Sequence, residues 1–238
     1  MVTPRAIFFD MDDTLLDGQL AATAAWLTVS EAVGPEIGIE PERLREAIRR
    51  ETAQFWKDEA AVGHWRLDLQ AAREHCTRLA LEAEKFDTSL ARQISIDYLD
   101  QHRANLQLFD DSIETLEAIR DAGFKLGLLT NGPRDMQRGK VDRFEFEDRF
   151  DVIVIEGEFG QGKPERAVFE HAMKTVGAKP EESWHVGDNL YADIGGANGA
   201  GVHSVWIHRE RLEKGDNPAA TPDREIGHLD ELRAALDL

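Results

Sequence analysis

The chain has 238 residues, a length that suits one large domain or a core with a second lobe. Asp and Glu outnumber Lys and Arg by 46 to 28, and hydrophobic residues make up 42% of the chain, a composition typical of globular proteins. The formal net charge of −18 argues against nucleic acid or an anionic membrane as a partner, because both attract basic surfaces. No signal-peptide pattern is present and no apolar run reaches the roughly 18 residues of a membrane span, so we expect a cytoplasmic protein.

The first part of the chain predicts one strand and then a series of helices. The continuous apolar run at residues 6–9 is typical of a strand that is buried on both faces. From residue 18 to residue 106, apolar residues recur at helical spacing, as in Leu44, Ala47 and Ile48, and no strand signal interrupts them. This segment therefore predicts a domain of three or four amphipathic helices.

Strand and helix patterns alternate in the remainder of the chain. The predicted strands cover residues 124–130, 152–155, 184–186 and 204–207, and the predicted helices cover residues 111–123, 134–148, 165–176, 190–200 and 229–236, with a surface loop at 213–224. Such alternation indicates βαβ units and a parallel sheet. We predict an α/β fold with a doubly wound, mainly parallel sheet in a Rossmann-like core. We expect residues 1–17 and 107–238 to form this core and residues 18–106 to form an inserted α-helical domain.

Polar side chains follow each of the first four predicted strands, in the order Asp10 and Asp12, Thr130 and Asn131, Lys163 after a glycine-rich loop, and Asp188 with Asp193. Ligands of open parallel sheets bind beyond the carboxyl ends of the strands, so we expect these groups to converge. An all-oxygen cluster without Cys or His is suited to Mg²⁺, and a lysine beside it is suited to phosphate.

Four segments resemble the four sequence motifs of the haloacid dehalogenase superfamily, in the same order: residues 8–17, residues 128–132, Lys163 within 162–164, and residues 187–194. The helical segment that follows the first strand matches the inserted cap of that family, so the resemblance covers essentially the whole chain.

The resemblance is to the phosphatase branch of the superfamily, because Asp12 supplies a carboxylic acid that the dehalogenase branch lacks at this position. Asp13 departs from the pattern, since many members carry Gly there. Residues 130–148 are more loosely similar to nucleotidases and N-acylneuraminate-9-phosphatases.

The family resemblance implies a role for each residue in the reaction. Asp10 would be the nucleophile that forms an aspartyl-phosphate. Asp12 would protonate the departing oxygen and then deprotonate the water that cleaves the intermediate. Thr130, the backbone N–H of Asn131 and Lys163 would hold the phosphoryl oxygens.

The same resemblance implies a Mg²⁺ site. The carboxylates of Asp10 and Asp188 and the backbone carbonyl of Asp12 would hold the ion, and Asp193 would support this shell of ligands.

These inferences predict a Mg²⁺-dependent phosphatase that hydrolyses a small phosphorylated metabolite, either a nucleotide or a sugar phosphate. Two alternatives share the same core: a phosphomutase, in which a second substrate hydroxyl accepts the phosphoryl group, and a phosphate-binding module without catalytic activity. The resemblance does not identify the physiological substrate or the oligomeric state.

Overall fold

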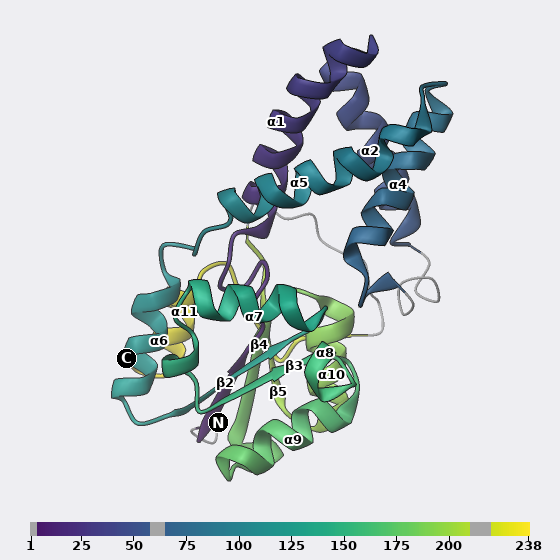
Figure 1. The fold of residues 1–238 in the computed structure, drawn as a ribbon. Coiled ribbons are helices and arrows are strands. Elements are labelled where there is room, and N and C mark those ends of the chain that lie inside the picture. The colour runs from purple at the N-terminus through teal and green to yellow at the C-terminus, as the bar shows by residue number, and fades with distance from the viewer. Residues whose placement is uncertain (1–3, 58–64, 210–219) are drawn as a thin grey trace. The chain divides into compact units, whose positions relative to one another are not determined.

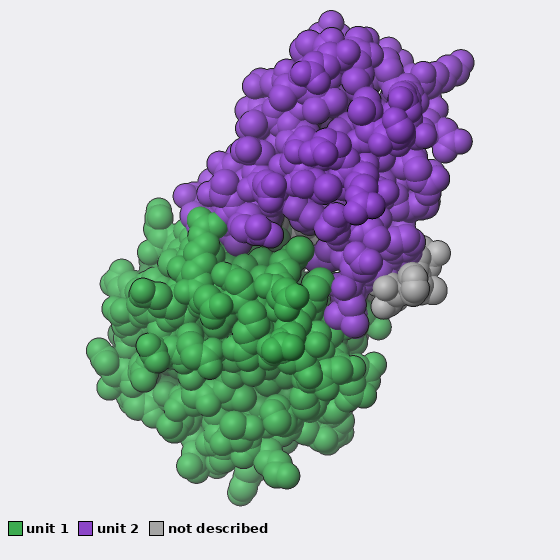
Figure 2. Space-filling model, viewed as in Figure 1, with its two compact units in different colours: residues 1–17, 108–238 green, residues 18–107 purple. Residues whose placement is uncertain are grey.

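The computed structural model describes residues 4–57, 65–209 and 220–238. The chain forms two compact units, one made of residues 1–17 and 108–238 and the other of residues 18–107 (Figure 2). The first unit contains the sheet and the second is helical, and each is described by itself below.

The first unit is built on a six-stranded sheet in the order β3-β2-β1-β4-β5-β6, and every neighbouring pair is parallel (Figure 1). The strands are β1 (Ala6–Phe9), β2 (Lys125–Thr130), β3 (Val152–Ile155), β4 (Ser183–Gly187), β5 (His203–Ile207) and β6 (Arg224–Ile226). The chain moves outward from β1 to β3 and then returns to the other side of β1, so the strand order reverses between β1 and β4. This is the doubly wound, Rossmann-like α/β fold that the sequence predicts, and the prediction is confirmed.

Helices cover the sheet, and they are α6 (Ser112–Asp121), α7 (Arg134–Arg143), α8 (Glu156–Phe159), α9 (Arg166–Val176), α10 (Gly196–Ala200) and α11 (Leu229–Ala235), with short 3₁₀ turns at Glu147–Arg149 and Pro180–Glu182 and a π-helical turn at Leu190–Gly195. Apolar residues of α9 and α10, among them Phe169 and Ala197, pack on Phe8 of β1 and Val154 of β3. Helix α6 contacts β2 and also α11, which contacts β6. Strands β1 and β3 are continuous apolar runs, as expected where both faces of a sheet are covered.

Four local predictions for this unit are wrong in their boundaries or type. The helix expected at 134–148 ends at Arg143, because Glu145 adopts a left-handed conformation (φ 54°) and the chain turns to bury Phe146. The expected glycine-rich loop contains α8, and the helix expected at 190–200 begins as a π-helical turn. Arg224, placed in a surface loop, starts strand β6, while the part of that loop up to residue 219 lies outside the described residues.

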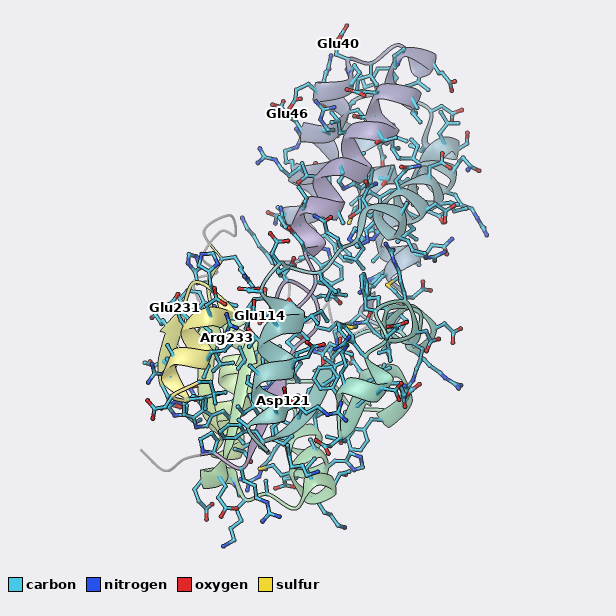
Figure 3. All side chains as sticks on the ribbon, turned by 90° about the vertical axis from the view of Figure 1, so that its left-hand side faces the viewer. Glu40, Glu46, Glu114, Asp121, Glu231 and Arg233 are labelled. Atoms are coloured by element: carbon cyan, nitrogen blue, oxygen red, sulfur yellow. The ribbon has the colours of Figure 1, made fainter. Side chains whose placement is uncertain are left out.

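The described residues of the second unit form α1 (Gly18–Ile37), α2 (Pro41–Phe55), α4 (Leu69–Ala83), a 3₁₀ turn at Thr88–Leu90 and α5 (Ala91–Asn105). An apolar core joins these helices through residues such as Ala25, Ile48, Leu81 and Tyr98. The ring of Trp26 stacks on that of Tyr98, with centroids 4.1 Å apart. Acidic side chains such as Glu40 and Glu46 project from the surface of this unit (Figure 3).

Among the described residues, no helix combines the length and the apolar character that crossing a membrane requires.

Arg209, at the end of β5, is an almost fully buried cation in the first unit. Its guanidinium makes two hydrogen bonds to the carboxylate of Asp111, of 2.9 and 3.0 Å, and donates to the backbone carbonyl of Thr14 at 3.0 Å. It also lies 3.9 Å from the ring centroid of Phe109, while Asp111 accepts the N–H of Leu229. Arg209 therefore links the loop after β1 with the segment that precedes α6 and with the start of α11.

Replacing Arg209 with methionine should reduce the free energy of unfolding by about 3 kcal/mol, because it leaves the half-buried Asp111 carboxylate without its cation. Arg233→Met is the matched control: Arg233 pairs with Glu114 and Asp230 near the surface of α11 and α6 (Figure 3), and its loss should change the stability little. Urea denaturation of both variants measures the difference. Equal effects would show that burial adds nothing to the Arg209 pair.

Candidate functional site

The parallel register brings the ends of β1, β2, β3 and β4 to one edge of the sheet. Phe9 of β1 lies opposite Leu128 of β2 and Val186 of β4, and Asp10 extends this ladder by donating its N–H to the Val186 carbonyl at 2.9 Å. The predicted site residues in the segments that follow the strands therefore meet at the carboxyl edge, beside the reversal of strand order where such folds bind ligands.

Three carboxylates form a cluster at this edge. Oxygen atoms of Asp10, Asp188 and Asp193 lie within 4.8 Å of one another. Asp10 and Asp193 are buried and Asp188 is half-buried. The indole N–H of Trp206 donates to the backbone carbonyl of Asp188 at 2.8 Å, which fixes the loop that carries this carboxylate.

The position of Asp193 depends on the turn that follows β4. The side chain of Asn189 caps this turn by accepting the N–H groups of Tyr191 and Ala192 at 2.9 and 2.8 Å. Asp193 accepts the N–H of Asn189 at 3.0 Å and lies against Gly187, where a Cβ atom would be only 2.3 Å from the Asp193 carboxyl carbon. Only glycine at position 187 leaves room for this carboxylate.

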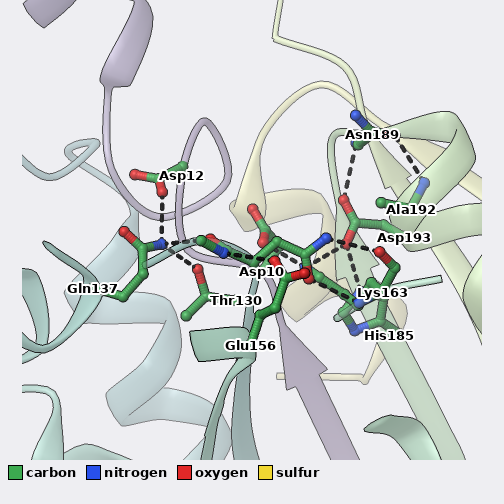
Figure 4. Close-up of polar contacts among 12 residues, drawn as sticks. Asp10, Asp12, Thr130, Gln137, Glu156, Lys163, His185, Asn189, Ala192 and Asp193 are labelled. Atoms are coloured by element: carbon green, nitrogen blue, oxygen red, sulfur yellow. Dashed lines mark hydrogen bonds and ion pairs between the residues drawn. The ribbon is translucent and has the colours of Figure 1, made fainter. Parts of the chain in front are cut away.

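Lys163 is the cation at the centre of the cluster, and 2% of its surface is exposed. Its ammonium group lies 2.5 Å from Asp10 Oδ1 and 2.6 Å from Asp193 Oδ1 (Figure 4). The side chain of Asn131 holds the backbone of Lys163 from both sides, because it accepts the Lys163 N–H and donates to the Lys163 carbonyl, each at 2.8 Å. The motif after β2 thus positions the lysine that follows β3.

The charges of the cluster shift its pKa values in opposite directions. Burial is the main cause that raises the pKa of Asp10 to about 7, with Lys163 opposing and Asp193 reinforcing the shift. Burial and the neighbouring carboxylates raise the pKa of Asp188 well above its usual value. Burial also acts on Asp193 and Lys163, but their mutual attraction and hydrogen bonding outweigh it, so the pKa of Asp193 is lowered and that of Lys163 is raised.

When its carboxylates are ionised, the described residues of the cluster have a net charge of −2. Asp10, Asp188 and Asp193 are three anions when ionised, Lys163 is one cation, and burial lowers the pKa of His185 so that its ring is neutral near pH 7. A divalent cation would neutralise this excess. Oxygen ligands with no thiolate match the preference of Mg²⁺, so the residues fit this ion.

Asp12 has different partners from Asp10, although the two are only two residues apart. Lys140 of α7 contacts both carboxylate oxygens of Asp12 at 2.7 Å, and the side-chain amide of Gln137 donates to Asp12 Oδ2 at 3.0 Å. The same amide nitrogen lies 2.6 Å from the hydroxyl of Thr130. Asp12 and Thr130 therefore meet at Gln137, beside the carboxylate cluster (Figure 4).

The loop from Asp10 to Asp17 explains why Asp13 can replace glycine. Leu15 and Leu16 both donate their N–H groups to the carbonyl of Met11, at 3.0 and 2.9 Å, which closes a tight turn. Asp13 has φ 59°, in the left-handed region where glycine is most common and aspartate is one of the better tolerated side chains.

The predicted site residues did not include His185, which contacts the cluster, or Gln137 and Lys140, which contact Asp12. Alternation along β4 predicts a structural role for His185, but the turn after β4 folds back over the same face, and His185 Nε2 lies 2.9 Å from Asp193 Oδ1. Gln137 lies four residues before buried Val141, and both are buried on α7. A polar residue in the buried stripe of a helix is the sequence signal that could have identified Gln137.

Glu156 is a third buried polar residue that the predictions omitted. Its carboxylate accepts the N–H of Gly132 at 2.9 Å, and a Cβ atom at Gly162 would lie 2.6 Å from the Glu156 carboxyl carbon. Glu156 therefore packs between the loop after β2 and the loop that leads to Lys163.

Comparison with known proteins identifies the family. The model of haloacid dehalogenase-like hydrolases matches residues 4–201. The chain belongs to this family. The resemblance seen in the four motifs is thus confirmed, and the protein is a hydrolase.

Curated relatives of this haloacid dehalogenase-like hydrolase are phosphatases. Phosphoserine phosphatase of Thermus thermophilus is 32% identical, and the match covers 96% of this chain and 97% of that protein. N-acylneuraminate-9-phosphatase of Mus musculus is 28% identical, and the match covers 98% of this chain and 93% of that protein. The looser similarity to N-acylneuraminate-9-phosphatases is confirmed, and the enzyme is of the phosphatase class.

A solved structure confirms the fold. The magnesium-bound HAD-hydrolase of Bacillus subtilis, whose crystal structure is described as revealing interdomain movement, superposes with a TM-score of 0.81. The match covers 99% of this chain and all of that one at 22% sequence identity.

Proposed function

We propose that this enzyme is a Mg²⁺-dependent phosphatase that hydrolyses a small phosphorylated metabolite through an aspartyl-phosphate on Asp10. The observation that carries the proposal is the buried cluster in which Asp10 shares Lys163 with Asp193 and lies next to Asp188. A carboxylate can attack an anionic phosphate ester only where the surrounding charges offset their repulsion. Lys163, together with a divalent cation held by the carboxylates, would supply that positive charge.

In this mechanism Asp10 is the nucleophile. One carboxylate oxygen of Asp10 attacks the phosphorus atom, and the bond between phosphorus and the ester oxygen breaks. Asp12 donates a proton to that oxygen, so an alcohol leaves rather than an alkoxide. Asp12 then takes a proton from the water that attacks the aspartyl-phosphate, which releases phosphate and restores Asp10.

Three groups are proposed to hold the phosphoryl oxygens during both steps: the hydroxyl of Thr130, the backbone N–H of Asn131 and the ammonium of Lys163. Lys163 is bound to Asp10 before substrate arrives, and Asn131 fixes its backbone, so little rearrangement is required.

Magnesium would be held by the carboxylates of Asp10 and Asp188 and by the backbone carbonyl of Asp12. When bound, it supplies positive charge that masks the phosphate anion. Asp193 is proposed to support these ligands from behind, since both of its oxygens already accept hydrogen bonds, Oδ1 from Lys163 and Oδ2 from the Asn189 N–H.

We further propose that the sheet-containing unit is the catalytic core, that the helical unit is the cap, and that the enzyme acts in the cytoplasm. The relatives act on phosphoserine and on N-acylneuraminate 9-phosphate by their names, which supports a small phosphorylated metabolite as the substrate class. No specific observation favours the phosphomutase or the non-catalytic module, and relatives that are phosphatases support hydrolysis.

The proposal predicts phosphate release from a panel of phosphate monoesters in the presence of MgCl₂, and at least about a 10³-fold loss in excess EDTA, as expected when the charge on both reactants is left unmasked. Readdition of Mg²⁺ should restore the rate, which separates metal removal from unfolding. The panel contains p-nitrophenyl phosphate, phosphoserine, sugar phosphates and nucleotides. Full activity in EDTA, or isomerisation of a sugar phosphate without net phosphate release, would contradict it.

A further inference from the structure

Gln137 makes an unusual set of contacts for a buried side chain. Only 1% of its surface is exposed, and its amide nitrogen lies near three oxygens: Thr130 Oγ1 at 2.6 Å, Asp12 Oδ2 at 3.0 Å and the Asn131 carbonyl at 3.0 Å. Each of these three residues has a role in the proposed reaction, and the side chains of Thr130 and Asp12 take part in it directly. The amide lies between them in Figure 4.

The chemistry of these partners fixes which end of the amide faces them. A backbone carbonyl only accepts hydrogen bonds, so the end of the amide that faces the Asn131 carbonyl must be the donating NH₂ of Gln137. That nitrogen has no lone pair available to accept a hydrogen bond. The hydroxyl oxygen of Thr130 must therefore accept from Gln137.

This arrangement determines where the hydrogen of the Thr130 hydroxyl can point. Within the described residues, the hydrogen-bond partner of the hydroxyl is Gln137, and in that hydrogen bond the hydroxyl oxygen is the acceptor. The O–H hydrogen is left to donate in another direction. At the carboxyl end of β2, next to Asp10 and Lys163, the group it can reach is a phosphoryl oxygen of the substrate.

We propose that Gln137 is a positioning residue. By donating a hydrogen bond to the Thr130 hydroxyl oxygen, it orients the O–H group so that this group donates to the phosphoryl group. The inference rests on the proposed function for the identity of the ligand. Without Gln137 the hydroxyl would rotate freely and could donate to the Asp12 carboxylate or the Asn131 carbonyl, both of which Gln137 now occupies. Pre-orientation would be lost before phosphate binds.

A double-mutant cycle with Thr130 distinguishes positioning from a general structural role. Calorimetry measures the dissociation constant of inorganic phosphate in the presence of Mg²⁺ for the wild type, Gln137→Met, Thr130→Val and the double variant. Gln137→Met and Thr130→Val should each weaken phosphate binding about tenfold, the size of one hydrogen bond. The double variant should be no more than about twofold weaker than Thr130→Val, because Gln137 acts through the hydroxyl that is already gone.

Matched controls exclude a nonspecific loss. Gln93→Met removes an exposed amide that donates to Asp97 on α5, and Thr115→Val removes a buried hydroxyl in α6 that has no partner within the described residues. Both should leave phosphate affinity within about twofold of the wild type, the usual result for groups that do not contact the ligand. Thermal melts verify that each variant is folded, and Gln137→Leu replaces Gln137→Met if the latter is not.

Independent effects, in which the double variant loses about a hundredfold, would overturn the positioning role, as would unchanged affinity in Gln137→Met. The outcome is separate from that of the proposed function, because binding is measured without turnover. A wild type that binds phosphate but cleaves no ester contradicts the phosphatase proposal and still allows the cycle to decide on Gln137. A wild type that binds no phosphate overturns the inference itself.

Discussion

Replacing Asp10 with asparagine is expected to reduce phosphate release by on the order of 10⁵-fold, the scale seen when a covalent hydrolase loses its nucleophile. The amide keeps the shape of the carboxylate but has no negatively charged oxygen to attack phosphorus, and its N–H group no longer attracts Lys163. The loss should be similar for every ester, because without the Asp10 carboxylate no ester can form the aspartyl-phosphate. Initial rates with p-nitrophenyl phosphate and an alkyl phosphate measure it.

Asp12→Asn provides the contrast for this experiment. Loss of the proposed acid should slow an alkyl phosphate by about 10²–10⁴-fold. In the first step, which releases the alcohol or phenol, the loss should be much smaller with p-nitrophenyl phosphate, whose leaving group needs little protonation. Measurable turnover by Asp10→Asn at more than about a hundredth of the wild-type rate would exclude Asp10 as the nucleophile. Equal losses for both esters in this first step of Asp12→Asn would exclude Asp12 as the acid.

Asp10 and Asp188 of the carboxylate cluster could be predicted because each directly follows a predicted strand. Asp10 comes after a four-residue run that is completely buried, and Asp188 follows β4 directly. Parallel pairing alone then brings them to one edge. Gln137 and His185 could not be found this way, since their contacts depend on how α7 packs and on how the π-helical turn after β4 folds back.

In the fold, too, elements with a sequence pattern of their own could be predicted, and elements that depend on distant contacts could not. Strand β3 is four apolar residues, Val152–Ile155, and was predicted with its observed bounds. Strand β6 contains Arg224, Glu225 and Ile226, which have no strand pattern of their own, and it exists because it pairs with β5 at the edge of the sheet. Helix α7 ends because Glu145 adopts the left-handed conformation. Glycine or asparagine usually marks this conformation in a sequence, and neither is present at position 145.

Magnesium is expected to stabilise the folded protein much more at pH 8 than at pH 5. In the metal-free protein the folded-state pKa of Asp10 is about 7, against 3.8 ordinarily, so between these values the unfolded chain ionises while the folded protein keeps its proton. The free energy of unfolding therefore falls as pH rises through this window, by on the order of 4 kcal/mol, and the raised pKa of Asp188 acts in the same direction. Bound Mg²⁺ reverses the loss, because it binds the ionised carboxylates.

Thermal melts in EDTA and in MgCl₂ at both pH values test this, with two Asp→Asn variants for comparison. Asp188→Asn removes a like charge from the cluster, so it should raise the melting temperature of the metal-free protein at pH 8 and abolish the response to Mg²⁺.

Asp151 lies just before β3, at the opposite end of the sheet. Burial alone would raise its pKa, but hydrogen bonds from Lys125 and the Leu126 N–H lower it overall. Asp151→Asn should therefore lower the melting temperature equally with and without Mg²⁺. Carboxylates with raised pKa values must lose their protons before they bind Mg²⁺, so binding at this cluster is stronger at pH 8 than at pH 5. A stabilisation by Mg²⁺ that is equal at both pH values, or that persists in Asp188→Asn, would therefore mean that the ion binds elsewhere.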